Sequence, residues 1–252
     1  MLQAWGVSEK GARPANQDRF AIDEELGLCI IADGMGGHNA GEIAARTAVD
    51  AVLDVVRGRR HAPLGWPFGF DPSLSDAGNL IRTAIHLANI RVLEQAGHCV
   101  AYAGMGTTIV AALVTGGRLA VGHAGDSRLY RLGGARLRQL TGDDSWIATV
   151  MAEDPLADAA LLQHHPMRHL LTNVVGSRRT TDVHVVEEPL AEGDRLLLTT
   201  DGVHGVLDGP RLARLLADGR DPAGAASEIV RAAIARGARD NCTAIVARYL
   251  PD

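Results

Sequence analysis

The chain has 252 residues, of which 46% are apolar and 22% charged, a balance typical of a globular protein rather than a disordered or fibrous one. Its formal net charge is −5, and no run of Lys or Arg is long enough to follow a nucleic-acid backbone, so we expect no nucleic-acid partner. No stretch of about 18 apolar residues occurs, and Met1 to Gln17 lack the apolar centre of a signal peptide, so we expect a cytoplasmic protein without membrane contact.

The first part of the chain predicts strands followed by helices. Short strands are expected at 3–8, 19–23 and 27–32. The third is a buried apolar run that ends at Asp33. Apolar residues then recur at helical spacing over 39–57, with Asn39 as the N-cap and Glu42 at the capping-box position. After a proline-rich connection, a second amphipathic helix is expected at 76–95.

The rest of the chain predicts mostly strands, expected at 107–115, 118–123, 128–132, 135–140, 182–186, 195–199 and 242–249. The first four are separated by Gly116-Gly117, Asp126-Ser127 and Gly133-Gly134, which are natural hairpin turns and indicate an antiparallel meander. Residues 144–171 are polar and weakly helical, and Asp221-Pro222 opens a helix that continues through Ile234. Because the long helices come in groups, the pattern favours antiparallel sheets flanked by helices, an α+β fold.

Four aspartates stand at turns that follow or join apolar strands: Asp33, Asp126, Asp201 and Asp240. Each one alone is typical of an ordinary turn carboxylate. If several strand ends meet at one rim, however, these like charges lie close together and resist joint ionisation unless cations neutralise them. All the candidate ligands are oxygens, with no Cys or His at ligand spacing, which favours Mg²⁺ or Mn²⁺ over zinc.

Eight short motifs follow one another along the chain. They are Arg13-Pro14-Ala15-Asn16-Gln17-Asp18, Ala32-Asp33-Gly34-Met35-Gly36-Gly37-His38, Gly104-Met105-Gly106-Thr107-Thr108, Gly122-His123-Ala124-Gly125-Asp126-Ser127-Arg128, Leu140-Thr141, Leu171-Thr172, Thr200-Asp201-Gly202 and Asp240-Asn241-Cys242-Thr243. In this order, from about Val7 to Tyr249, the sequence resembles the metal-dependent serine/threonine protein phosphatases of type 2C in their compact bacterial form. The resemblance implies a four-layer αββα sandwich, with two mostly antiparallel β-sheets flanked by helices. It also implies one catalytic domain over 1–252, with a flap subdomain at about 144–170.

The resemblance further implies a metal centre with two core ions and a weaker third one. Asp33 would bridge two Mg²⁺ or Mn²⁺ ions, whose other protein ligands would be the Gly34 carbonyl and Asp18 on one side and Asp201 and Asp240 on the other. Asp126, together with Asp201, matches the third metal site of the family, although a plain turn role for Asp126 stays open. A water held between the two core ions would be the nucleophile, so no phospho-enzyme is expected.

Two further residues are candidates for contact with the substrate. Arg13 matches the phosphate-binding arginine of the family, and its planar fork can grip two phosphoryl oxygens; a solvated loop arginine is the alternative. The serine alkoxide leaving group needs a proton or a metal. Eukaryotic members carry His directly after the Asp-Gly pair, where this chain has Met35, so His38 is the candidate general acid, with helix capping or packing as the alternative. In the flap we expect solvated or hydrogen-bonded histidines rather than metal ligands at His164, His165 and His169.

These features predict hydrolysis of phosphoserine and phosphothreonine in proteins. The resemblance implies phosphorylated proteins and a cognate Hanks-type Ser/Thr kinase as partners, and we expect a monomer. One alternative is a pseudophosphatase that binds phosphosites without turnover, but that hypothesis predicts broken metal ligands and none of the five aspartates is lost. Another is a different metal-dependent phosphohydrolase, acting on a nucleotide or on the phosphoserine of a regulator, because sites rather than folds decide function.

Overall fold

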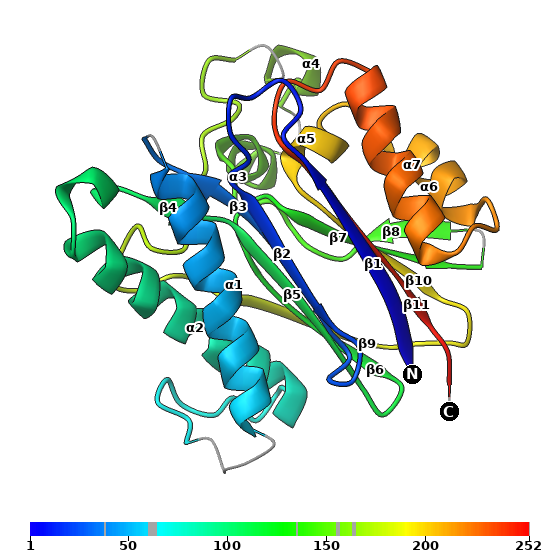
Figure 1. Ribbon diagram of the computed structural model, residues 1–252, viewed down its shortest axis with the longest axis horizontal. Helices are drawn as coiled ribbons and strands as arrows, with labels where there is room; N and C mark the ends of the chain where they lie inside the picture. The colour runs from blue at the N-terminus through cyan, green and yellow to red at the C-terminus, as the bar shows by residue number, and fades with distance from the viewer. Residues whose placement is uncertain (38, 60–64, 135, 155–156, 163–164, 252) are drawn as a thin grey trace.

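The computed structural model describes all residues of 1–252 except 38, 60–64, 135, 155–156, 163–164 and 252. Its centre is a pair of packed antiparallel sheets (Figure 1). Sheet I contains, in spatial order, β1 (Leu2–Glu9), β11 (Cys242–Tyr249), β10 (Arg195–Thr199), β7 (Arg128–Gly133) and β8 (Arg136–Gln139). Sheet II contains β2 (Asp18–Asp23), β3 (Leu28–Met35), β5 (Ile109–Thr115), β6 (Arg118–Ala124) and β9 (His184–Pro189), and the short β4 (Gly106–Thr107) pairs with β3.

Helices cover the outer face of each sheet (Figure 1). Sheet II is covered by α1 (Ala40–Arg59) and α2 (Asp76–Gly97), and a 3₁₀ turn, η1 (Val100–Tyr102), follows α2. Sheet I is covered by α5 (Asp201–His204), α6 (Gly209–Ala217) and α7 (Pro222–Ala235). The prediction of a four-layer αββα sandwich is therefore confirmed. No helix of the described residues has both the length and the apolar character needed to cross a membrane.

The strand β3 shows why the apolar run of the sequence forms a central strand. Successive side chains of a strand point to opposite faces of the sheet. Leu28, Ile30 and Ala32 pack against the helices of sheet II, whereas Cys29 and Ile31 pack into the layer between the two sheets. Both faces are buried, so the run is apolar throughout rather than alternating.

The predicted start of α7 is confirmed, whereas Glu42, predicted at a capping-box position, pairs instead with Arg19. Asp221 accepts a hydrogen bond from the Gly224 N–H at 2.7 Å, with a proline at the first helical position of α7. Ser75 caps α2 in the same way, by accepting a bond from the Gly78 N–H. The second predicted helix, 76–95, is thus confirmed and continues for two more residues.

The predicted meander is wrong at one turn. Gly116-Gly117 and Gly133-Gly134 do form hairpins, joining β5 to β6 and β7 to β8. Asp126-Ser127, however, carries the chain from β6 in sheet II to β7 in sheet I. Gly125, at φ +102°, turns the backbone out of sheet II, and the Ser127 hydroxyl bonds the Thr108 hydroxyl at 2.8 Å. A hairpin and a sheet crossing have the same local pattern of apolar run and turn, so the sequence alone does not separate them.

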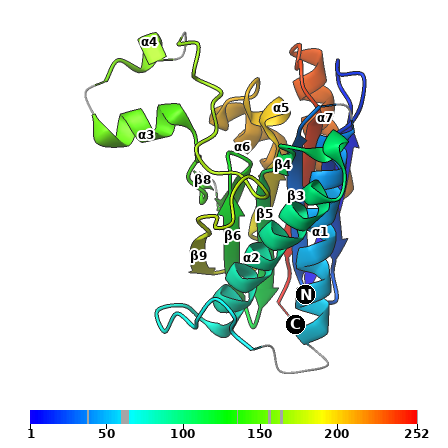
Figure 2. The same cartoon turned by 90° about the vertical axis from the view of Figure 1, so that its left-hand side faces the viewer.

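The segment 144–171, called the flap below, carries two short helices, α3 (Trp146–Glu153) and α4 (Ala159–Leu162). Figure 2 shows both helices standing away from the sandwich. An isolated bridge between Ser145 and Leu171 closes the base of the flap. The ring of Trp146 stacks on the ring of His165, with centroids 4.3 Å apart. The weakly helical character predicted for this segment agrees with these short helices.

Candidate active site

Five aspartates from both sheets gather at one end of the sandwich. Asp18 begins β2 and is the direct antiparallel partner of Asp33, near the end of β3. Asp201 begins α5, immediately beyond β10, and Asp240 precedes β11. Asp126 lies in the crossing between β6 and β7. Because neighbouring antiparallel strands place the end of one beside the start of the next, these five sequence positions share one rim.

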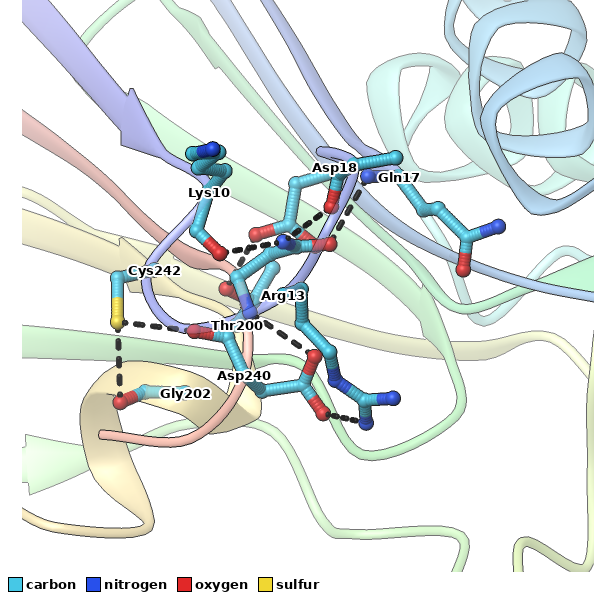
Figure 3. Close-up of polar contacts among 10 residues, drawn as sticks. Lys10, Arg13, Gln17, Asp18, Thr200, Gly202, Asp240 and Cys242 are labelled. Atoms are coloured by element: carbon cyan, nitrogen blue, oxygen red, sulfur yellow. Dashed lines mark hydrogen bonds and ion pairs between the residues drawn. The ribbon is translucent and has the colours of Figure 1, made fainter. Parts of the chain in front are cut away.

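A cleft of about 490 Å³ opens at this rim. Its floor and sides include four of the aspartates, Asp33, Asp126, Asp201 and Asp240. The flap contributes 169–171, and the loop before β2 contributes Arg13. Figure 3 shows Arg13 beside Asp240, with Asp18 close by. The cleft therefore combines carboxylates, an arginine and a wall supplied by the flap.

One oxygen of Asp18 is fixed by hydroxyl donors. Its Oδ2 accepts hydrogen bonds from Thr243 Oγ1 at 2.6 Å and from Thr200 Oγ1 at 2.9 Å. The network continues through Ser8 Oγ, 2.7 Å from Thr243 Oγ1, to the Asn16 side-chain amide, which donates to Ser8 Oγ at 2.8 Å. The other oxygen, Oδ1, is buried and has no hydrogen-bond partner. The protein thus orients this carboxylate and leaves one of its oxygens available.

Asp33 is held by its backbone against Thr108, between β4 and β5, and the glycine after it permits a close approach to α1. The Asp33 N–H donates to Thr108 Oγ1 at 3.0 Å, and the Asp33 carbonyl accepts from the Thr108 N–H at 2.9 Å. At Gly34, a Cβ atom would overlap the carbonyl oxygen of Gly41. Only glycine fits at this position, which keeps the Gly34 backbone close to the cleft.

The loop that carries Arg13 is fastened to the start of β11. Nη2 of Arg13 donates to Asp240 Oδ2 at 2.6 Å (Figure 3). The Asn241 side chain bonds three backbone groups of the loop, namely the carbonyls of Lys10 and Ala15 and the N–H of Gln17, each at 2.9 Å. The guanidinium is consequently positioned at the mouth of the cleft, although its side chain is 56% exposed.

The crowded carboxylates strongly affect one another. Burial raises the pKa of Asp33 well above its usual value, and the charges of the other four aspartates raise it further. Burial also raises the pKa of Asp18 to about 7, and burial followed by the charge of Asp201 raises the pKa of Asp126 to about 7. The pKa of Asp201 is raised by burial and then by Asp240, while a hydrogen bond with Asp33 acts in the opposite direction. Near neutral pH this cluster needs protons or cations to neutralise it.

The donor set fits a hard divalent cation. The buried Oδ1 atoms of Asp18 and Asp201 both lack a hydrogen-bond partner, and carboxylate and carbonyl oxygens are the ligands that Mg²⁺ and Mn²⁺ prefer. Among the described residues, no three His, Cys, Asp or Glu side chains already form a coordination shell. In the structure Asp240 is paired with Arg13. The fit therefore rests on donor chemistry, charge and the two unpartnered oxygens.

Sequence reasoning located the charged residues of the cleft and missed several of their partners. The structure brings together all the proposed metal ligands and Arg13, but His38 and His164 lie outside the described residues. His169, expected to be a solvated or hydrogen-bonded residue rather than a metal ligand, is exposed and lines the cleft. The supporting residues Thr200, Asn241 and Thr243 all occur in the motifs quoted above. Their place in these motifs was the only feature of the sequence that could have identified them as part of the site.

Comparisons with known proteins agree on one family. The sequence model described as Protein phosphatase 2C matches residues 6–236. The "Serine/threonine phosphatase stp" of Listeria monocytogenes is 28% identical over 237 residues, covering 93% of this chain and 90% of that protein. The "Serine/threonine protein phosphatase PstP" of Mycobacterium tuberculosis is 30% identical over 240 residues, covering 95% of this chain but only 43% of the longer relative. The crystal structure of the PstP catalytic domain in complex with two manganese ions superposes with a TM-score of 0.83 at 27% identity, covering 99% of each chain. By sequence and fold, this chain belongs to the protein phosphatase 2C family.

Proposed function

We propose that this protein is a Mg²⁺- or Mn²⁺-dependent phosphatase that hydrolyses phosphoserine and phosphothreonine in proteins. The observation that carries the proposal is the convergence of five aspartates from two sheets on a cleft that also holds an arginine. The names of the similar proteins and the two manganese ions of the PstP catalytic domain support it.

We assign the ligands of the core ions to Asp33 as the bridge, with Asp18, the Gly34 carbonyl, Asp201 and Asp240 completing the set. Asp33 would be shared between the ions, a role that the resemblance implies and that its place among the other four aspartates supports. Asp126 and Asp201 would hold a third, weaker ion. When bound, the ions neutralise the carboxylates, lower the pKa of a water molecule and compensate charge that develops on the phosphoryl group.

The residues of the chain orient the substrate around this centre. Arg13 bonds Asp240 through Nη2, and its remaining N–H groups can grip phosphoryl oxygens. The hydrogen bond to Asp240 raises the pKa of Arg13 above its ordinary value, so the guanidinium stays charged. The assignment of the general acid to His38 remains a prediction. We also propose a single catalytic domain over 1–252, a monomer, and a cognate Ser/Thr kinase that phosphorylates the same proteins.

The test is Mn²⁺-dependent release of phosphate from a phosphothreonine peptide. Asp33→Asn and Asp240→Asn should each reduce turnover by more than about 100-fold, because each removes a charged metal ligand. Asp218→Asn is the matched control, because Asp218 forms only an exposed ion pair with Arg220. This variant should hydrolyse the peptide at the wild-type rate. Normal turnover in both cleft variants would refute the mechanism.

The alternatives are separated by two comparisons on the wild-type protein. A pseudophosphatase would bind the phosphopeptide without releasing phosphate at any concentration of Mg²⁺ or Mn²⁺. A phosphohydrolase of another class would act faster on nucleotides or small phosphate esters than on a phosphoserine protein. The proposed function requires the phosphoserine and phosphothreonine substrates to be preferred over phosphotyrosine.

A further inference from the structure

Asp144, at the start of the flap, is joined to the turn that carries Asp126. The Gly125 N–H donates to Asp144 Oδ2 at 2.9 Å, and the Asp144 N–H donates to the Gly125 carbonyl at 3.0 Å. These two bonds hold the residue directly before Asp126. The position of Asp126 in the cleft therefore depends on where the base of the flap lies.

The same carboxylate oxygen, and the Asp144 carbonyl, also bond the two residues that directly follow the flap. The Asn173 side-chain amide donates to Asp144 Oδ2 at 2.7 Å, and the Thr172 N–H donates to the Asp144 carbonyl at 2.9 Å. Asn173 is buried and fastened in turn, because its amide also donates to the Asp182 carbonyl and its Oδ1 accepts from the Thr181 hydroxyl. Both ends of the flap thus meet at one side chain.

The second oxygen of Asp144 binds the edge strand of sheet II. His184 Nε2, on β9, lies 2.9 Å from Asp144 Oδ1. The Asp144 side chain is only 14% exposed, whereas the His184 side chain is 49% exposed. One carboxylate therefore connects the crossing turn, the base of the flap and the sheet, with partners on both of its oxygens.

We infer that Asp144 is a positioning residue for the reaction, one that fixes the Asp126 turn and the cleft-lining segment of the flap relative to each other. The inference rests on the proposed function for its kinetic consequence. The flap residues 169–171 line one side of the cleft and Asp126 lines another. Groups behind a metal ligand set the orientation of that ligand, and their loss costs about 10- to 100-fold in metal affinity or activity. Asp144→Ala should therefore weaken the response to Mn²⁺ and loosen the flap together.

The experiment compares Asp144→Ala with Asp144→Asn and with a matched control, Asp23→Ala. Asp23 also accepts the Leu26 N–H and pairs with Arg57, and its side chain is 16% exposed. It lies at the opposite end of β2 from Asp18, so its loss should reduce stability without reaching the cleft. Asp144→Asn keeps an oxygen that can accept from Gly125 and Asn173, and should restore most of the function that alanine removes.

Two quantities are measured on each full-length variant. The first is the Mn²⁺ concentration that gives half-maximal turnover, which should rise about tenfold in Asp144→Ala. The second is the rate of trypsin cleavage after Arg168, an exposed residue and the only Arg or Lys between Trp146 and Leu170. Cleavage should be about tenfold faster in Asp144→Ala, because opening of the flap base exposes this bond more often. Asp23→Ala should leave both quantities unchanged.

The inference is overturned if Asp144→Ala lowers only the melting temperature, as Asp23→Ala does, and leaves both quantities at wild-type values. If Asp144→Ala does not fold, His184→Ala is measured instead, because it removes the partner of Oδ1 and leaves the bonds of Oδ2 in place, although it also removes the ring contact with His123. That variant should shift both quantities in the same direction by about threefold, and no shift in either would overturn the inference. A wild-type protein without Mn²⁺-dependent turnover would refute the proposed function, while the trypsin rates and calorimetric titration with Mn²⁺ would still test Asp144.

Discussion

Asp18→Asn should stabilise the metal-free protein and remove its response to Mn²⁺. Burial raises the pKa of Asp18 from 3.8 to about 7, so the folded state favours the protonated form. For a carboxylate with a raised pKa, stability falls as pH rises from about 4 to about 7, and the full penalty is present above that range. At about 1.4 kcal/mol per pKa unit, the shift corresponds to roughly 4 kcal/mol at about pH 8. Asparagine removes the charge and keeps an oxygen for Thr200 and Thr243.

The assay is urea unfolding at about pH 8, with EDTA or with Mn²⁺. Wild type should gain about 2.7 kcal/mol when Mn²⁺ is 100 times its dissociation constant. Asp18→Asn should unfold at higher urea than wild type in EDTA and gain little from Mn²⁺. At about pH 5 the advantage of the variant should fall to less than half, because Asp18 is then protonated in the folded wild type. A variant that is less stable than wild type in EDTA at about pH 8, or that gains as much from Mn²⁺, would refute this reasoning.

Further predictions concern the cleft and the layer behind it. Arg13→Lys should lower kcat/KM for a phosphopeptide by about tenfold at saturating Mn²⁺, because lysine cannot grip two phosphoryl oxygens; unchanged kinetics would contradict the assignment. The calorimetric affinity for Mn²⁺ should rise between about pH 5 and pH 8, since Asp18 and Asp126, with pKa values of about 7, must lose protons to bind; a constant affinity would count against them as ligands. Burial lowers the pKa of His123 to about 4, so the unfolded chain takes up its proton first and stability should fall as pH drops from about 6.5 to about 4. His123→Phe should show a shallower fall in melting temperature over that range, and an identical profile would show that this imidazole does not contribute. Gly34→Ala should destabilise the protein by more than about 2 kcal/mol in urea unfolding, because its Cβ would meet backbone; wild-type stability would show that the contact yields easily.

The positions of most helices and strands could be predicted because the spacing of apolar residues along the sequence indicates which side chains are buried. The run over 28–32 is apolar on both faces and forms the central strand β3, and Asp221-Pro222 opens α7 as its capping chemistry requires. The choice of sheet for each strand could not be predicted in this way. Asp126-Ser127 has the composition of a hairpin turn, yet its neighbours lie in different sheets, because only tertiary packing decides where β7 pairs.

For the site, sequence reasoning located the charged residues but not what holds them. The aspartates stand at turns after strands, and the resemblance to type 2C phosphatases supplied their roles. Thr243, by contrast, donates to Asp18 from 225 positions away, and Asp144 meets Asn173 and His184 only in the folded chain. Hydrogen bonds between distant segments leave no periodic trace in a single sequence, so these supporting residues became visible only in three dimensions.

The place of β11 in sheet I has a consequence for the newly made protein. This strand lies between β1 and β10, and the residues around its start include Asp240, Asn241 and Thr243. A ribosome releases this part of the chain after the segments that carry Asp18, Asp33, Asp126 and Asp201. Until then Asp18 lacks the hydroxyl of Thr243 and the cluster lacks Asp240, so a nascent chain cannot complete the proposed ion-binding centre. Phosphatase activity should consequently begin only after residues 240–243 have been translated and β11 has paired with β1 and β10.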